Sequence, residues 1–279
     1  MEKVWFITGA SSGIGYGIAQ AALERGDKAI IAARSKDKLQ ALADRFPGQA
    51  QVLVLDVSDA GSIAQAMSQI ADRLDDVDVL VNNAGYGYRA AVEEGEDSEI
   101  RKLYDTNVWG PVRLMKAVLP HMRARKQGTI INISSIAAVR PGVGSGYYSS
   151  SKAALERLSD AVSDEVQHLG IHVMIVEPGA FRTAFFDALH GTKEPIGDYD
   201  ATAGKNRIEN IVNHHDQPGN PEAAGQCLVD LIHKGFFPHR LALGSDALQF
   251  ISQQLTQRQE ELTAWQGISR QTDFSKSES

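Results

Sequence analysis

Short, almost continuously apolar runs alternate along this chain with longer amphipathic stretches, and this alternation constrains the fold more than any other feature. Runs rich in Val, Ile and Leu are typical of strands that are buried on both faces of a parallel sheet. Between two of them, Leu155, Leu158 and Val162 are spaced for one face of a helix. The predicted strands are Val4–Thr8, Ala29–Ala33, Val52–Leu55, Val79–Val81, Thr129–Ile133, His172–Val176 and Leu241–Leu243.

This order of elements predicts an α/β protein with a doubly wound parallel sheet of about seven strands and helices on both faces. The chain has 279 residues, which fits one large domain over 1–279 at least as well as two small ones. The hydrophobic fraction of 43% is enough for a sizeable core. We find no repeat of fixed period and no long linker.

Two segments depart from the pattern. Residues 184–220 contain several glycines and prolines and have weak periodicity. A stretch of that length inside a compact domain is typical of a lid or binding loop, or is disordered, and we expect a substrate lid here. Residues 267–279 are mostly polar, so we expect a flexible tail.

Composition excludes several classes of partner. The chain has 28 basic and 35 acidic residues, a net charge of −7, which argues against nucleic acid or an anionic membrane surface. Its apolar runs are far shorter than the roughly 20 residues of a membrane span. Residues 1–8 enter a strand-like run with no basic leader segment. The single cysteine, Cys227, excludes an intrachain disulfide and suits a reducing cytoplasm, which is the expected location.

A glycine-rich segment follows the first predicted strand and precedes a helical pattern. Such a loop directs backbone N–H groups and the positive end of the helix dipole toward an anion, which suits a pyrophosphate. Its spacing, G-x-x-x-G-x-G, differs from the common dinucleotide fingerprint, but its place after the first strand favours a nucleotide site. The loop residues expected to bind the cofactor are Gly9, Ser11, Ser12, Gly13, Ile14 and Gly15.

The residue after the second strand indicates which cofactor binds. In dinucleotide-binding folds an acid at this place accepts hydrogen bonds from the ribose 2′-OH of NAD, whereas an arginine neutralises the 2′-phosphate of NADP. This chain has Arg34 there and no acid until Asp37, so we expect NADP(H). Asp56 and Val57, after the third strand, are candidates for contact with the adenine.

Tyr148 and Lys152 are four residues apart, so on a helix they share one face. A free phenol has a pKa of about 10, and a nearby cation favours the phenolate, so this pair can exchange protons near neutral pH. Tyr147 is less well placed relative to Lys152. Ser134 and Ser135 follow the fifth predicted strand, at the edge of the sheet where ligands bind, and either hydroxyl could polarise a substrate carbonyl.

Together these residues resemble the short-chain dehydrogenase/reductase family, over about Val4 to Leu243. The implied fold is a single-domain Rossmann fold, and the implied activity is hydride transfer between NADP(H) and an alcohol, ketone or aldehyde. The matching motifs are Thr8–Gly15 with T-G-x-x-x-G-x-G, Asn82–Gly85 with N-N-A-G, Asn107 with the helix asparagine, Tyr148 and Lys152 with Y-x-x-x-K, and Pro178–Gly179 with the P-G that follows a strand.

The resemblance also implies roles for single residues. Tyr148 is the general acid in reduction and the base in oxidation, and Lys152 holds the nicotinamide ribose and lowers the pKa of Tyr148. The family's catalytic serine lies thirteen positions before its tyrosine, which selects Ser135. Asn107 supports a water that leads to Lys152. Further cofactor contacts implied by the family are Asn83, Ala84, Gly85, Pro178, Gly179, Phe181 and Thr183.

No metal is implied. His214 and His215 are adjacent, so their side chains point in different directions and indicate a solvated loop. Finer motifs at Glu177–Thr183 and Leu243–Ala247 resemble the hydroxysteroid- and retinol-dehydrogenase-like branch. Pocket candidates that suggest a small apolar or aromatic substrate are Tyr86, Tyr88, Val139, Phe181, Phe185 and Phe186.

By analogy with the family we expect a homodimer or homotetramer that associates through the helices Ile100–Lys126 and Tyr148–Leu169. Two alternatives stay open. Sugar-nucleotide epimerases of the extended branch have a different glycine spacing and a longer chain. A regulatory NADP-binding protein without catalysis would not need the four catalytic residues that are present here.

Asn107 and Pro111 are four residues apart in one helical pattern. Proline has no N–H and its ring crowds the carbonyl four residues earlier, so we expect the helix to bend here. The carbonyl of Asn107 then needs another donor, and we expect an ordered water, the proton-relay water of the family. The alternative is that Pro111 only shapes helix packing.

Overall fold

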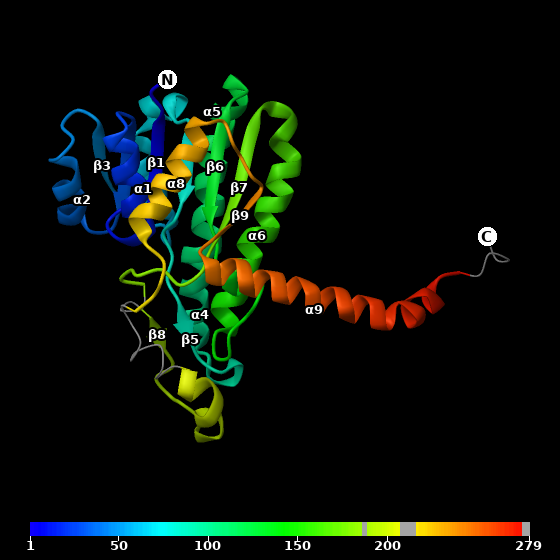
Figure 1. Cartoon of the computed structure of the whole chain (residues 1–279). Helices are drawn as coiled ribbons and strands as arrows, with labels where there is room; N and C mark the ends of the chain where they lie inside the picture. Colours follow the sequence, from blue (N-terminus) through cyan, green and yellow to red (C-terminus); the bar gives the residue numbers. More distant parts are fainter. Residues whose placement is uncertain (186–188, 207–215, 275–279) are drawn as a thin grey trace.

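The computed structural model describes residues 1–185, 189–206 and 216–274, and a parallel sheet forms its centre (Figure 1). Over these ranges seven strands pair in the order β3-β2-β1-β4-β6-β7-β9, and every pair is parallel. The predicted doubly wound α/β fold is therefore confirmed, and each predicted run overlaps one strand. The strands are β1 Val4–Thr8, β2 Lys28–Ala33, β3 Ala50–Val54, β4 Val79–Asn82, β6 Gly128–Ile133, β7 Ile171–Pro178 and β9 Arg240–Leu243.

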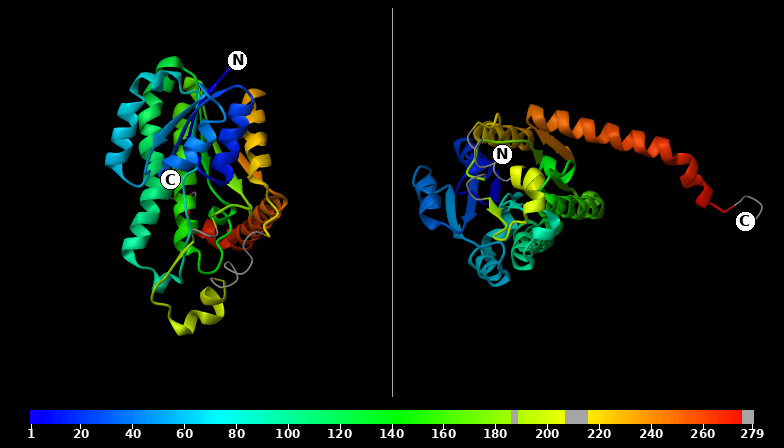
Figure 2. Two further views of the ribbon diagram at one scale, coloured as in Figure 1. Left: turned by 90° about the vertical axis from the view of Figure 1, so that its left-hand side faces the viewer. Right: turned by 90° about the horizontal axis from the view of Figure 1, so that it is seen from below.

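Helices cover both faces of this sheet, as the views in Figure 2 show. Consecutive strand residues point to opposite faces, so Trp5 and Ile7 belong to one core and Phe6 to the other. Because both faces are buried, the strands are apolar without alternation. One face packs on α1 Gly13–Glu24, α2 Lys36–Ala43 and α8 Pro221–His233, and the other on α3 Ala60–Gln69, α5 Gly110–Arg125 and α6 Gly146–Val166.

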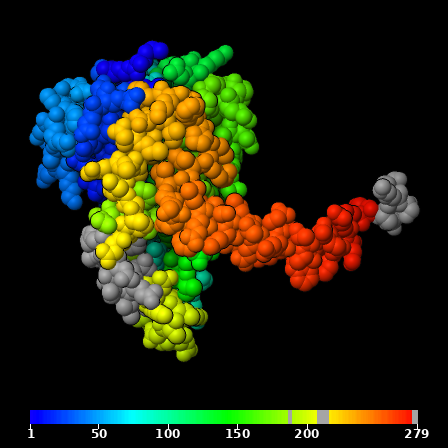
Figure 3. All heavy atoms as spheres, in the orientation of Figure 1, coloured from blue at the N-terminus to red at the C-terminus, as the bar shows by residue number. Residues whose placement is uncertain are grey.

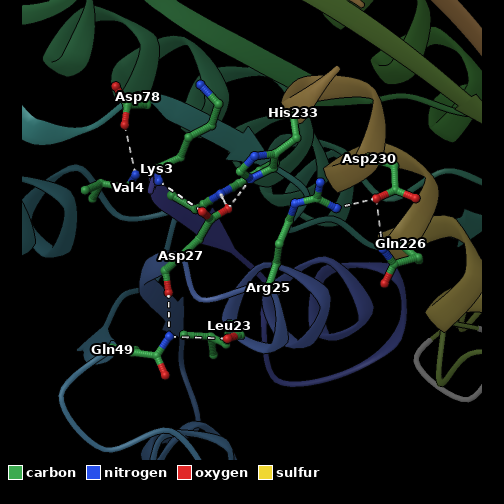
Figure 4. Close-up of polar contacts among 11 residues, drawn as sticks. Lys3, Val4, Leu23, Arg25, Asp27, Gln49, Asp78, Gln226, Asp230 and His233 are labelled. Carbon is green, nitrogen blue, oxygen red and sulfur yellow. Dashed lines mark hydrogen bonds and ion pairs between the residues drawn. The ribbon is translucent and has the colours of Figure 1, made fainter. Parts of the chain in front are cut away.

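A buried carboxylate, Asp27, ties together the edge of the sheet where the strands begin (Figure 4). Its oxygens accept hydrogen bonds from the backbone N–H of Lys3 at 3.0 Å and from the indole Nε1 of Trp5 at 2.8 Å. The Nε2 atom of His233, in the last turn of α8, lies 2.7 Å from the same carboxylate. These contacts join the first strand, the turn after α1 and the end of α8.

The helical stretch around Asn107 is interrupted. Helix α4 ends at Tyr104, a π-helical turn spans Asp105–Trp109, and α5 begins at Gly110. Within this turn the N–H of Gly110 bonds the carbonyl of Asp105, five residues earlier. Pro111 lies in the first turn of α5, where its missing N–H costs little. The irregularity expected at Asn107 and Pro111 thus takes the form of a π turn.

The described part of residues 184–220 docks beside a short strand outside the main sheet. Strand β8, His190–Gly191, pairs with β5, Tyr88–Arg89, in parallel. At the end of the chain, α9 spans Ser245–Ser269, so the first residues of the expected tail are helical. Figure 1 shows α9 leading away from the sheet. No helix in the described ranges is both long and apolar enough to cross a bilayer.

Candidate active site

A cleft of about 860 Å³ lies at the edge of the sheet where the parallel strands end. Ligands bind at this edge in doubly wound sheets because loops from neighbouring strands meet there. The sequence-predicted residues that line the cleft are Gly9, Ser11, Ser12, Gly13, Ile14, Arg34, Asp56, Val57, Asn83, Ala84, Gly85, Ser135, Tyr148, Lys152, Pro178, Gly179, Phe181 and Thr183.

The glycine loop is shaped by its backbone and by Asn83. Gly9 and Gly13 have φ angles of +65° and +60°, which residues with a side chain rarely adopt. The amide of Asn83 donates to the carbonyls of Thr8 at 3.0 Å and Gly9 at 3.2 Å. A Cβ on Gly15 would lie 2.3 Å from the Asn83 amide nitrogen. Gly15 therefore lies behind the cleft lining, where its lack of a side chain lets α1 pack against the loop.

Positive charge gathers at one end of the cleft. Arg34 follows β2, and Lys38, on the first turn of α2, lines the cleft beside it. Asp56 also lines this end, but its Oδ1 accepts hydrogen bonds from the Ser58 N–H at 2.9 Å and the Ser58 hydroxyl at 2.6 Å. The carboxylate of Asp56 is thus held in a local turn, whereas Arg34 and Lys38 line the cleft as cations.

The tyrosine and lysine of α6 are buried in the wall of the cleft. Burial raises the pKa of Tyr148, while a hydrogen bond with Ser135 and the nearby charge of Arg89 act in the opposite direction. Burial lowers the pKa of Lys152 to about 8, and its Nζ donates to the carbonyl of Ile133 at 2.8 Å. Ser135 lies at the end of β6, where its hydroxyl accepts the N–H of Ala137 at 3.1 Å. A proton donor and a second hydroxyl therefore face one region of the cleft.

Asn107 lies behind this group and is fully buried. Its amide nitrogen donates to the Tyr86 carbonyl at 3.0 Å and to the Ser151 hydroxyl at 3.1 Å, and its Oδ1 accepts the Tyr86 N–H at 3.2 Å. A Cβ on Gly85 would lie 3.1 Å from this Oδ1 and 3.3 Å from the Lys152 Nζ, so Asn107 and Lys152 approach each other across that glycine. The water expected at the Asn107 main-chain carbonyl stays a prediction.

Comparison with known proteins assigns this arrangement to a family. Residues 3–194 match the family model described as short chain dehydrogenase. The chain belongs to the short-chain dehydrogenase/reductase family. It is thus a member of a family of oxidoreductases, and the Rossmann fold expected from the motifs is confirmed.

Individual relatives cover most of the chain. A 3-ketodihydrosphingosine reductase from Bacteroides thetaiotaomicron is 35% identical over 87% of this chain and 88% of its own length. A short-chain dehydrogenase from Streptomyces avermitilis is 42% identical, covers 98% of this chain and 100% of its own, and has a TM-score of 0.91. An alcohol dehydrogenase from Thermococcus sibiricus, solved with 5-hydroxy-NADP, is 27% identical, covers 87% and 96%, and has a TM-score of 0.71.

The pocket residues expected in this dehydrogenase divide into two groups. Tyr86, Phe181 and Phe185 line the cleft, and the ring centroid of Phe185 lies 5.6 Å from that of Tyr148. Tyr88 does not line it, because its hydroxyl is turned to the carboxylate of Glu96 at 2.5 Å. Val139 is also outside the lining. Phe186 lies outside the described residues.

Several lining residues were missed by the sequence reasoning, notably Lys38, Arg89 and Phe250. Lys38 follows Arg34 by four residues, and this spacing at a helix start could have indicated it. Arg89 has no such signal, because it lies in an irregular stretch after the N-N-A-G motif. Phe250 reaches the cleft from α9, at the far end of the chain, and only tertiary structure brings it there.

Two buried acids lie next to the catalytic wall. The hydroxyl of Ser134 donates to Glu156 at 2.6 Å, which explains why the neighbouring Ser135 is the serine that faces Tyr148. Burial and the nearby Glu156 raise the pKa of Glu177, at the end of β7, to about 7. Burial also raises the pKa of Glu156. The two carboxyls are thus buried close to each other, and the charge of Glu156 also acts on Lys152.

Proposed function

We propose that this dehydrogenase is an NADP(H)-dependent oxidoreductase that interconverts an alcohol and a ketone or aldehyde, with Tyr148 as general acid and base. The observation that carries the proposal is the meeting of Ser135, Tyr148 and Lys152 in one wall of the cleft that begins at the glycine loop. A phenol, a hydroxyl and an ammonium group at that place supply what hydride transfer to a carbonyl requires besides the hydride donor.

The loop fits a dinucleotide. Gly9 and Gly13 line the cleft, and a Cβ on Gly13 would lie 3.1 Å from Cγ2 of Thr183, so the passage between them leaves no room for a side chain. When bound, the nicotinamide supplies or accepts the hydride. Thr183, Pro178 and Gly179 are the residues we assign to the nicotinamide side of the cleft, and Asn83, Ala84 and Gly85 to the middle.

The charges at the adenosine end support NADP rather than NAD. Arg34 and Lys38 are two cations that both line this end, where a 2′-phosphate would add a dianion. The only acid lining the described part of the cleft, Asp56, is already bonded to Ser58. The NADP analogue bound by the relative from Thermococcus sibiricus is consistent with this choice.

In reduction, Ser135 and Tyr148 hold the carbonyl oxygen by hydrogen bonds. The hydride adds to the carbonyl carbon, the C=O π bond breaks toward oxygen, and that oxygen takes the proton of the Tyr148 hydroxyl. The Lys152 ammonium stabilises the phenolate that remains. A proton from solvent, passed along the water that we place at Asn107 and Lys152, then restores the Tyr148 hydroxyl. Oxidation follows the same steps in reverse.

The first test replaces the proton donor. Tyr148→Phe keeps the ring that packs on Phe185 but has no hydroxyl, so kcat should fall by at least about 100-fold in NADPH-dependent carbonyl reduction. Tyr147→Phe is the matched control, because its hydroxyl donates to the Val92 carbonyl at 2.6 Å and lies outside the cleft lining. Near-normal turnover by Tyr148→Phe would refute the mechanism. Binding of NADPH without turnover of any aldehyde or ketone would favour the catalytically silent alternative.

The second test addresses cofactor choice. Arg34→Leu should lower kcat/KM for NADPH by about tenfold or more and leave NADH nearly unchanged, since one charge-assisted contact contributes about 1.5–3 kcal/mol. Steady-state rates with both cofactors measure this. Lys36→Leu is a suitable control, because Lys36 is not part of the described cleft lining. An equal loss for both cofactors would show that Arg34 does not contact the 2′-phosphate.

The substrate we propose has a small apolar or aromatic body, because Tyr86, Phe181, Phe185 and Phe250 line the cleft and the ring centroid of Phe185 lies 5.6 Å from that of Tyr148. Residues 184–220 act in this proposal as a substrate lid, since Phe185 and Asn206 belong to the lining. The enzyme would act in the cytoplasm as a homodimer or homotetramer.

A further inference from the structure

Arg89 brings a positive charge to the substrate end of the cleft, and no described residue forms an ion pair with it. It lies in β5, and its guanidinium carbon is 5.6 Å from the centroid of the Tyr148 ring. Its Nε and Nη1 atoms are buried, and neither has a hydrogen-bond partner in the part of the chain that the structure describes. The same side chain lines the cleft together with Ser135 and Tyr148. A charged group is thus held beside the Tyr148 ring, and its Nε and Nη1 donors are not bonded to any described residue.

Other arginines with a buried, unbonded nitrogen differ in that each has an ionic partner. The Nη2 atom of Arg113 lies 3.7 Å from Oδ1 of Asp105. The Nη1 atom of Arg125 lies 4.0 Å from Oδ1 of Asp78. No such pair is found for Arg89 among the described residues, and the one acid in the described cleft lining, Asp56, is at the adenosine end. Buried guanidinium nitrogens without a partner are unfavourable, so a partly buried arginine that has no anion among the described residues is suited to an anionic ligand.

We propose that Arg89 binds a carboxylate of the substrate, so that this enzyme acts on oxo acids and hydroxy acids whose remaining body is apolar or aromatic. This inference rests on the proposed function, because the carboxylate on Arg89 would hold the carbonyl between Tyr148 and Ser135. Arginine binds carboxylates through two parallel N–H donors, which fixes orientation as well as affinity. The carboxylate takes no part in the hydride and proton transfers described above.

Matched pairs of substrates test this assignment. Benzoylformate, 3-benzoylpropionate and levulinate would each be compared with their methyl esters, with NADPH as the reductant. For at least one pair the wild type should prefer the acid by tenfold or more in kcat/KM. Arg89→Met should remove that preference, mainly by raising KM for the acid, and Arg89→Lys should retain part of it. Arg140→Met is the control: Arg140 also lines the cleft, but its guanidinium stacks over Phe250 at 4.4 Å, so acid and ester should change alike.

The outcome can be separated from failure of the proposed function. Reduction of esters as fast as acids would overturn the role of Arg89 while leaving the reductase activity in place. An Arg89 that only adjusted Tyr148 would change kcat equally for acid and ester. Binding without turnover gives a second measurement: benzoate or glutarate should raise the Tm of the wild-type complex with NADP⁺ but not that of Arg89→Met. No shift with either anion, together with no acid preference, would refute the proposal.

A separate observation concerns α9, which extends from the body of the molecule as an arm (Figure 3). Every residue from Leu255 to Ser269 is exposed, yet this part contains large apolar side chains: Leu255 is 57%, Leu262 68% and Trp265 62% exposed. A lone helix without packing is marginally stable in water, and an exposed one usually relies on many charge pairs. Residues 251–269 contain only three charged residues, Arg258, Glu260 and Glu261.

The spacing of these apolar residues indicates what covers them. Leu248, Leu255 and Leu262 are seven residues apart, and Ile251 and Trp265 fall at the intervening positions of the same seven-residue pattern. This spacing resembles the apolar seam of a helix that pairs with another helix, with Arg258 as its one charged member. Arg258 falls within this row of apolar residues, and Glu261 lies beside it on the next turn of α9. Two antiparallel copies of α9 can therefore place these opposite charges together at the middle of the paired helices.

We infer that α9 is an interface for a second copy of this chain. The test is sedimentation of the full-length protein over a range of concentrations. Leu255→Asp/Leu262→Asp should lower the assembly state by one step, to monomer from dimer or to dimer from tetramer. Gln253→Asp/Ala264→Asp puts the same side chains on the opposite face and should leave the assembly intact. A wild-type monomer at all concentrations, or identical assembly of both double variants, would overturn the inference.

Discussion

Two buried charges at opposite edges of the sheet differ in how fully they are bonded. Asp27 lies where the strands begin, is 1% exposed, and receives donors from Lys3, Trp5 and His233. Arg89 lies where the strands end, and two of its buried nitrogens have no partner among the described residues. The first carboxylate is fully bonded within the protein, whereas the second group has free donors among the described residues and is the one that we propose binds a ligand.

The difference follows from what each edge does. At the starting edge the carboxylate closes a corner between β1, α1 and α8, so each of its bonds contributes to the folded state (Figure 4). At the other edge Arg89 has two buried nitrogens without a partner among the described residues, and an incompletely bonded group is typical of functional sites. Comparing the two edges therefore separates residues kept for stability from residues kept for binding.

The largest expected effect is on stability at the starting edge. Asp27→Ala leaves the Trp5 indole N–H and the His233 ring without their acceptor, so the free energy of unfolding should fall by about 3 kcal/mol. Urea unfolding followed by circular dichroism measures this. At a temperature where the variant is folded, its kcat should be close to that of the wild type, because Asp27 is remote from the cleft lining.

Asp230→Ala is the matched control for that experiment. Asp230 forms an ion pair with Arg25 at 2.6 Å near the same corner, but these side chains are 36% and 40% exposed (Figure 4). An exposed pair contributes about 1 kcal/mol or less. Equal losses for Asp27→Ala and Asp230→Ala would show that burial does not distinguish the two carboxylates.

The contacts at the edge where the strands begin could not be predicted from the sequence, whereas many residues of the cleft at the other edge could. Chain order and apolar patterning predicted all seven strands of the described sheet, and helical spacing placed Tyr148 and Lys152 on one face. Local spacing left Ser134 and Ser135 open, and the family resemblance selected Ser135, which lines the cleft with them. The contact between Asp27 and His233 joins residues that are 206 positions apart, so no local sequence pattern could predict it.

Arg89 and Phe250 were not predicted as cleft residues for a related reason. Arg89 belongs to a two-residue strand whose partner, His190–Gly191, is a hundred positions away and has no apolar period. Tyr88, expected in the pocket, is turned away by a hydrogen bond to Glu96 that its own spacing could not reveal. Long-range contacts between irregular segments therefore determine which residues line the proposed substrate end of the cleft. Regular strands and helices determine which residues line the proposed cofactor end.

An intermediate effect is expected from Glu177, a buried acid at the catalytic edge. Its pKa is raised from the ordinary 4.5 to about 7, so between these values the folded protein holds a proton that the unfolded chain has released. The free energy of unfolding should therefore fall as the pH rises from about 4.5 to 7 and stay level above. Glu177→Gln removes this dependence, so its stability relative to the wild type should increase by on the order of 2 kcal/mol from pH 5 to pH 8.

Urea unfolding of both proteins at several pH values measures that difference. Glu165→Gln is the control, because Glu165 is on the same layer of the fold, in α6, but is exposed. Its difference from the wild type should be the same at pH 5 and pH 8. A Glu177→Gln curve parallel to that of the wild type would mean that the carboxyl of Glu177 is not buried as a proton-bearing acid.

The smallest expected change in the free energy of unfolding is that of Arg89→Met, and its sign is compared directly with the loss expected for Asp27→Ala. Arg89→Met keeps a long side chain that can pack on the Tyr148 ring but removes the unpaired buried charge, so the ligand-free variant should be as stable as the wild type or more stable by about 1 kcal/mol. The unpaired nitrogens of Arg89 are the reason for this sign, since no bond within the described residues is lost with them. Benzoate should reverse the order, because a ligand that binds only the folded wild type stabilises it in proportion to RT ln(1 + [L]/Kd). Urea unfolding with and without benzoate, in the presence of NADP⁺, measures both signs. A loss of several kcal/mol in the ligand-free variant would place Arg89 with Asp27, as a residue that the fold itself requires.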